Sequence, residues 1–194
     1  MPAKPFHQVL RGGDRRSIGR SNQAAARVLR RPQSFPALMN CLWSDDPLVR
    51  MRAADAAEKV SGQRPDLLVP FKAELLGLAD EAVEPELRWH LARMLPRLPL
   101  GPSERARAIA RLRNYLSDRS SIVKTMAIQG LFELARASPA ARQDLSTFLE
   151  ECCRTGTPAM KARSRKLLSQ LCHQESAPRE IPPAQQIRKR KLRR

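Results

Sequence analysis

The chain has 194 residues, and its 36 Lys and Arg against 19 Asp and Glu give a formal net charge of +17. Its apolar runs are only a few residues long, far short of the roughly 18 that a membrane span requires. The basic N-terminus also lacks the apolar block of a secretory signal. The sequence therefore predicts a soluble, cytoplasmic protein without membrane association, and its charge raises the hypothesis of nucleic-acid binding.

The positive charge is concentrated at the two ends of the chain. Residues 1–33 hold eight Lys or Arg and one acid, residues 172–194 hold seven and two, and residues 34–171 hold 21 and 16. The body is therefore only mildly basic. We expect residues 1–19 to be a disordered basic N-terminus and residues 174–194 to be a Pro-containing linker followed by a basic tail.

Helical patterns fill the sequence between these ends. The first, over residues 21–31, is interpreted as a capping helix because it is too short to form a full repeat. After it, two kinds of helix alternate. The first kind begins at Ser or Asp and covers residues 34–43, 66–79, 103–117 and 138–153.

The second kind of helix repeats one buried stripe. It is clearest in "DDPLVRMRAADAAEKV" from Asp45, and the same register returns at offsets of 38, 36 and 37 residues. Positions i, i+4, i+8 and i+11 lie along one helical face. They are apolar except for one serine: Val49, Ala53, Ala57 and Val60; Leu87, Leu91, Leu95 and Leu98; Val123, Ala127, Leu131 and Leu134; Met160, Ser164, Leu168 and Leu171.

Each second helix also begins with a start signal. The signals are Asp46-Pro47, Glu84-Pro85, Ser120-Ser121 and Thr157-Pro158. Asp, Ser and Thr cap free N–H groups of a first turn, and Pro is tolerated just inside it. Paired helices this short must stack on their neighbours to bury their stripes, so the sequence predicts a solenoid.

The Asp-Pro turn, the Val49-Arg50 pair and the alanines that follow closely resemble the second helix of HEAT repeats. The resemblance implies an all-α, right-handed α-solenoid of about four HEAT-like helix pairs over residues 20–173, including the capping helix. In that family a turn Asp and a helix Arg tie neighbouring repeats together. Asp46 with Arg50 matches this pattern, and Glu84 with Arg88 matches it approximately.

Two later pairs, Ser120 with Lys124 and Thr157 with Lys161, lack the acidic partner. An unbroken ladder between repeats is therefore not expected.

In HEAT-like arrays the second helices line the concave face, which is the usual binding surface. Counting about 100° per residue, Trp89 points away from the buried stripe among cationic side chains. It is either an anchor for a partner or leans over the next repeat to cover Ala92 or Pro96. The candidate partner-binding residues are Trp89, His90, Arg93, Arg97, Arg52, Lys59, Arg163 and Lys166. The other tryptophan, Trp43, is expected in the core.

The tail over residues 185–194 is either an electrostatic arm for nucleic acid or acidic surfaces, or a solvated end. Its cationic residues are Arg188, Lys189, Arg190, Lys191, Arg193 and Arg194.

The four cysteines, Cys41, Cys152, Cys153 and Cys172, fit no zinc pattern and are expected to be reduced; Cys41 and Cys152 fall where helices bury small apolar residues.

We expect a monomeric, non-catalytic scaffold that binds a protein partner on its concave face, without metal or cofactor. The alternative is a nucleic-acid-binding solenoid that uses the same face and the basic tails. An alkylpurine DNA glycosylase-like enzyme is the least favoured interpretation, because aromatics make up only 4% of the chain and no convergent set of acid, base and nucleophile is visible.

Overall fold

The computed structural model describes residues 4–14, 17–135 and 139–176, and every regular element in these ranges is a helix. The all-α prediction is therefore confirmed. None of the helices in the described ranges is long and apolar enough to span a membrane. The predicted basic tail lies outside the described residues.

The N-terminal part differs from the sequence prediction. Residues 4–14 fall within the stretch expected to be disordered, but they contain helix α1, Phe6–Leu10, whose two end residues are buried. The expected capping helix is present as α2, Ser21–Arg30. Two apolar anchors in a five-residue helix were not recognised as a helical pattern, because the helix is too short to show a period.

Four helix pairs follow α2, close to the predicted positions. The first member of each pair is α3, α5, α7 or α9, and the second is α4, α6, α8 or α10. Short 3₁₀ segments extend three of these helices. The bounds are α3 Phe35–Met39 with η2 Asn40–Trp43, α4 Pro47–Gln63, η3 Pro65–Phe71 with α5 Lys72–Glu81, α6 Pro85–Met94 with η4 Leu95–Arg97, α7 Pro102–Tyr115, α8 Ser121–Ala135, α9 Pro139–Thr155 and α10 Pro158–Ser176.

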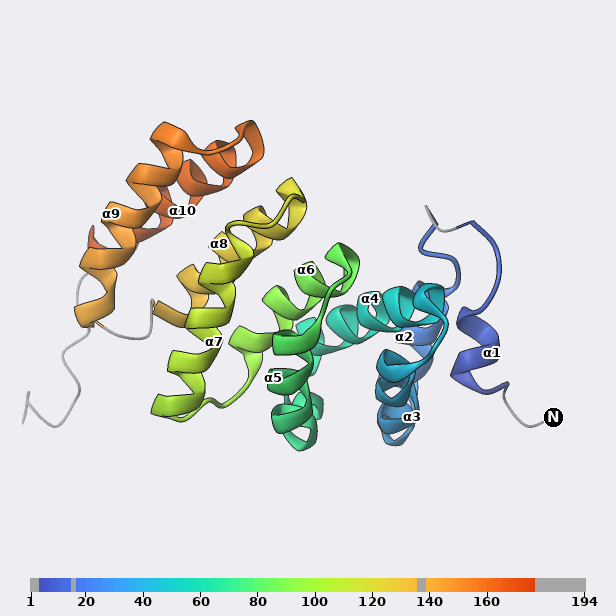
Figure 1. Ribbon diagram of the computed structural model, residues 1–194. Coiled ribbons are helices and arrows are strands. Elements are labelled where there is room, and N and C mark those ends of the chain that lie inside the picture. Colours follow the sequence, from blue (N-terminus) through green and yellow to red (C-terminus); the bar gives the residue numbers. More distant parts are fainter. Residues whose placement is uncertain (1–3, 15–16, 136–138, 177–194) are drawn as a thin grey trace, which may run out of the picture.

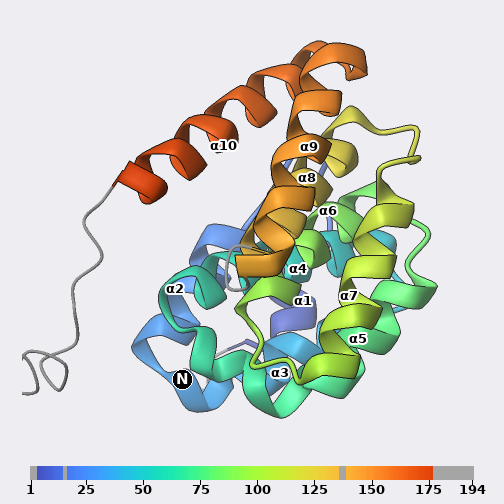
Figure 2. The same ribbon diagram turned by 90° about the vertical axis from the view of Figure 1, so that its left-hand side faces the viewer.

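The helices form two layers. Helices α4, α6, α8 and α10 lie side by side in chain order, and α2 packs against α4 at one end of this layer. The first members of the pairs pack against the second helices, and Figure 2 shows α5 and α7 together on one side of α4, α6 and α8. Each pair therefore contacts mainly the pair before it and the pair after it (Figure 1).

The repeated stripe is the seam along which these pairs are joined. In the first three copies all of its residues are buried, including Leu95 at 0% and Leu131 at 7% exposure. In the fourth copy Ser164 and Leu171 are buried, whereas Met160 and Leu168 are half-buried. The predicted stripe is confirmed, and it loosens only at α10, which has no described helix pair beyond it.

The predicted start signal of α4 forms a cap at the first turn of that helix. Asp46 accepts a hydrogen bond from the Leu48 N–H at 2.9 Å, and Pro47 begins α4. Glu84, the weaker candidate, makes no capping bond. Cys41 and Cys152 are buried as predicted, and all four cysteines are free thiols.

The prediction that Trp43 belongs to the core is wrong, because its side chain is 47% exposed. The reason is a change of helix type after Met39. Residues 40–43 form the 3₁₀ segment η2, which turns about 120° per residue instead of about 100°. Over four residues this adds roughly 80°, which rotates Trp43 away from the face that Met39 buries.

Candidate functional site

The candidate residues lie on the layer of second helices. We call the surface of α4, α6, α8 and α10 that is turned away from the first helices the second-helix face. Trp89, Arg93 and Arg97 come from α6 and its 3₁₀ extension, Lys59 from α4 and Lys166 from α10. The helices that carry these residues pack side by side in chain order.

Trp89 is half-buried in the middle of this face. It packs against the main core, and its ring lies 3.3 Å from the His90 ring, centroid to centroid, with an interplanar angle of 32°. The neighbouring helices carry Met51 and Met126 at or next to the equivalent position, and both are also half-buried. The register therefore predicts a row of three large apolar side chains across α4, α6 and α8.

His90 does not belong to the exposed site, because it is 1% exposed. Burial lowers its pKa to about 4, an effect that the charges of Asp55 and Glu58 oppose. Its Nδ1 atom has no hydrogen-bond partner. The helical count placed His90 at the edge of the outward face, and the adjacent α4 covers that edge.

Arg52 is likewise buried, at 2% exposure, and cannot contact a partner directly. Its guanidinium donates hydrogen bonds to the backbone carbonyls of Leu10, at 2.8 Å, Gly12, at 2.5 Å, Asp14, at 3.0 Å, and Ser17, at 3.2 Å. Described residues at the end of α1 and on the way to α2 therefore surround this guanidinium. Carbonyl dipoles, rather than a carboxylate, provide its hydrogen bonds.

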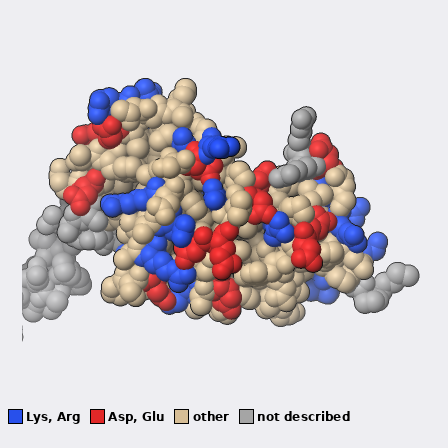
Figure 3. Space-filling view, in the orientation of Figure 1, with Lys and Arg blue, Asp and Glu red and all other residues tan. Residues whose placement is uncertain are grey.

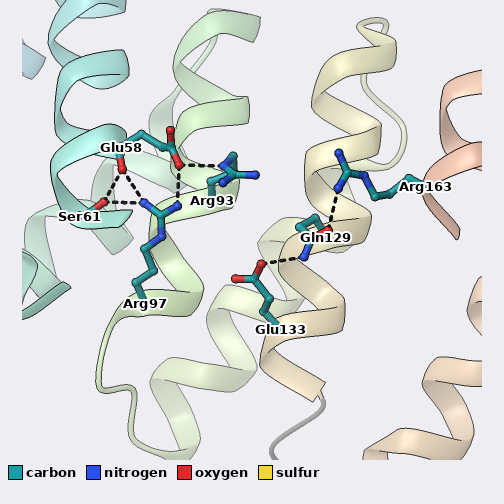
Figure 4. Close-up of polar contacts among 7 residues, drawn as sticks. All are labelled: Glu58, Ser61, Arg93, Arg97, Gln129, Glu133 and Arg163. Atoms are coloured by element: carbon teal, nitrogen blue, oxygen red, sulfur yellow. Dashed lines mark hydrogen bonds and ion pairs between the residues drawn. The ribbon is translucent and has the colours of Figure 1, made fainter. Parts of the chain in front are cut away.

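Arg93 and Arg97 are both bound to one carboxylate of the preceding pair. Glu58 of α4 accepts from Arg93 Nε at 2.8 Å and from Arg97 Nη2 at 2.5 Å (Figure 4). Arg97 also donates to the Ser61 hydroxyl at 2.7 Å. Burial tends to raise the pKa of Glu58, but the two arginines outweigh it and lower that pKa. Two of the predicted cations are therefore partly neutralised within the chain.

The remaining candidate cations differ in how free they are. Lys59 Nζ binds Asp55 at 2.5 Å and Asn22 at 2.6 Å. Arg163 of α10 donates to Gln129 of α8 at 3.1 Å, and Gln129 in turn donates to Glu133 (Figure 4). Only Lys166 among the eight candidates is both exposed and without an assigned partner in the described part of the chain.

A ladder of polar contacts also ties the pairs together at the turns between first and second helices. Arg50 pairs with Glu84, and Arg88 pairs with Asp118 at 2.5 Å. The next contact in this series is uncharged: the Ser121 and Thr157 hydroxyls lie 3.1 Å apart. The Arg of one pair thus binds the turn acid of the following pair, and the ladder loses its charge where the sequence loses its acids.

Sequence reasoning missed Asp118 and Glu58 as partners. Asp118 lies two residues before the expected cap at Ser120 and also accepts the Ser120 N–H at 2.7 Å. A search for an acid about one repeat downstream of each helix Arg would have found it, since Arg88 and Asp118 are 30 residues apart and Arg50 and Glu84 are 34 apart. Glu58 carries no such local signal.

In the ranges that the structure describes, no group of three or more His, Cys, Asp and Glu side chains is placed to hold a metal ion. No protein-family model matches the chain, and no curated protein matches it either.

Proposed function

We propose that the chain is a HEAT-like α-solenoid that acts as a non-catalytic scaffold and binds a protein partner on its second-helix face. Three observations support the solenoid: the four matched helix pairs, their shared buried stripe, and the polar contacts between pairs, both at the turns and from Glu58 to Arg93 and Arg97. In this proposal the second-helix face is the concave one, which is the binding surface in arrays of this kind.

Trp89 and its surroundings carry the functional part of the proposal. Trp89 keeps exposed surface, and the register places Met51 and Met126 at or next to its position on the neighbouring helices. Arg93 and Arg97, which follow Trp89 in the chain, are already bound to Glu58. The centre of the face is therefore apolar with partly neutralised charge. Trp and Met are enriched at protein interfaces, where a central aromatic side chain often supplies most of the affinity.

The test compares two variants of the full chain. Bait protein captures partners from nuclease-treated lysate, and the affinity of each partner identified is measured for the wild type, for Trp89→Ala and for Val69→Ala, a control at an exposed apolar residue outside the second-helix face. An anchor at Trp89 contributes about 2 kcal/mol or more, so Trp89→Ala should weaken binding about 30-fold. Equal affinities for the wild type and a folded Trp89→Ala variant would refute the proposal.

Nucleic-acid binding remains the second candidate because of α10. Its Lys161, Arg165 and Lys166 have no assigned partner within the described residues, and they precede the basic tail in sequence. If this surface and the tail bind duplex DNA, log K should fall steeply with log salt, with a slope of about −5 from the six tail charges alone. Removal of residues 185–194 should then flatten the slope. An unchanged slope would exclude the tail from binding.

A further inference from the structure

A hollow of about 270 Å³ opens between the turns of the first two helix pairs. Its wall includes Trp43, whose 47% exposure is unusual for so large an apolar side chain. The η2 segment fixes the orientation of this ring, and Leu42 beside it is fully buried. We call this hollow the Trp43 pocket. It is lined by Leu42, Trp43, Ser44, Asp45, Arg50, Leu78, Glu81, Ala82, Glu84 and Leu87.

The Trp43 pocket carries a local negative charge in a strongly basic protein. Arg50 is its one cation and is already bound, to the Glu84 carboxylate and to the Ser44 carbonyl at 2.6 Å. The carboxylates of Asp45 and Glu81 have no assigned partner among the described residues. Figure 3 shows acidic side chains gathering over α5, the helix that ends at Glu81. Two carboxylates without an assigned partner therefore line the same hollow as an exposed indole ring.

This combination selects a cationic side chain. The face of an indole ring attracts an ammonium or guanidinium group, and carboxylates accept charge-assisted hydrogen bonds from the same groups. The surrounding positive charge of the chain would repel a cation at long range, so recognition must rest on short-range contacts in the pocket.

We propose that the Trp43 pocket binds a Lys- or Arg-rich segment of a partner protein, with one cationic side chain over the Trp43 ring and hydrogen-bonded to Asp45 and Glu81. Charge complementarity between the two free carboxylates and the segment chooses this occupant over an acidic or purely apolar one. The site shares no residue with the proposed Trp89 anchor, so either proposal can fail while the other stands.

The first experiment measures the fluorescence of Trp43 itself. In a full-length Trp89→Phe variant, Trp43 is the only tryptophan, and its emission is followed while a capped peptide of alternating Arg and Ser is added. A cation over the ring should change the emission intensity saturably at about 0.15 M salt. A capped peptide of alternating Glu and Ser is the control and should produce no saturable change. No saturable response to the Arg peptide would overturn the proposal.

The second experiment measures affinity for the same Arg peptide by calorimetry on full-length variants. Trp43→Ala and the double variant Asp45→Asn/Glu81→Gln should each weaken binding about fivefold or more. The matched control is Asp144→Asn/Glu150→Gln on α9, which removes two exposed carboxylates elsewhere and should leave the affinity within twofold. Circular dichroism checks that each variant remains helical.

Two results would overturn the proposal. Equal weakening by the α9 control would mean that the peptide senses only the overall charge of the chain. Concentration-dependent self-association that both Trp43→Ala and removal of residues 185–194 abolish would assign the Trp43 pocket to the basic tail of a second copy instead of a partner protein.

Discussion

A close approach between two second helices, α6 and α8, provides a test of how these helices stack. Gly130 of α8 faces α6, and a Cβ atom added there would lie 2.5 Å from the Ala92 carbonyl oxygen and 2.9 Å from Leu112 Cδ1. The first of these atoms is backbone and cannot move unless α6 and α8 separate. Gly77 of α5 is also inside a helix, but a Cβ added there meets nothing within 4 Å.

Comparison of Gly130→Ala with Gly77→Ala isolates the contact between the pairs. Both substitutions gain about 1 kcal/mol from helix propensity, because Ala is a better helix former than Gly. Only Gly130→Ala adds overpacking, which costs about 1 to 3 kcal/mol. We therefore expect Gly77→Ala to stabilise the protein and Gly130→Ala to be less stable than Gly77→Ala by about 1 to 3 kcal/mol.

Urea unfolding followed by circular dichroism measures this difference, with the denaturant slope compared among wild type and both variants. If Gly130→Ala gains as much stability as Gly77→Ala, α6 and α8 do not approach each other as described, and the stacking of the second helices is wrong.

Three further predictions concern other contacts. His90 has a folded pKa of about 4 against an unfolded value near 6.5, so the unfolded chain binds more protons between these values. Stability should therefore fall by roughly 3 kcal/mol as the pH drops through that window. His90→Gln should flatten the pH dependence of urea unfolding, and an unchanged dependence would contradict the burial of His90. Gly19 has φ +53°, and a Cβ atom added there would lie 2.6 Å from Arg52 Cζ. Gly19→Ala should therefore speed tryptic cleavage after Arg20 more than Gly12→Ala, because a Cβ atom added at Gly12 meets nothing within 4 Å. Equal cleavage rates for the two variants would contradict the contact with Arg52. Asp118→Asn should lower the free energy of unfolding by roughly 1 to 2 kcal/mol, because it weakens the bond to Arg88, whereas Asp66→Asn, in an exposed pair, should cause no measurable change.

Periodicity predicted the elements and the seam well, because both are local properties of a helix. Whether Leu91 or Ala127 points inward follows from the spacing of apolar residues along its own helix, and both are fully buried. The start signals were local as well, and Asp46 caps α4 with its own side chain. A sequence therefore shows which face of each helix is buried.

The candidate site was harder to predict, because the state of an outward side chain depends on its neighbour. Arg93 and Arg97 point away from the stripe as expected, but their partner Glu58 lies 35 and 39 residues upstream. Arg52 was predicted at the site but is buried, and the reason is again a distant neighbour. The residues that cover it, among them Leu10 and Gly12, precede α2 and carry no recognisable pattern. Counting charges on a helical face overestimates its positive potential when the adjacent repeat supplies the counter-charge.

The outer face of α10 is more polar than the corresponding face of the second helices before it. The residue five positions after the start of the stripe faces the following pair, and it is fully buried in the first three copies as Ala54, Ala92 and Ile128. In α10 that position is Arg165, which is exposed. A helix pair packed on this face in the manner of the earlier pairs would bury the Arg165 charge, which is costly unless a carboxylate pairs with it. The apolar contact that joins each of the first three pairs to the pair after it is therefore interrupted at this position of α10.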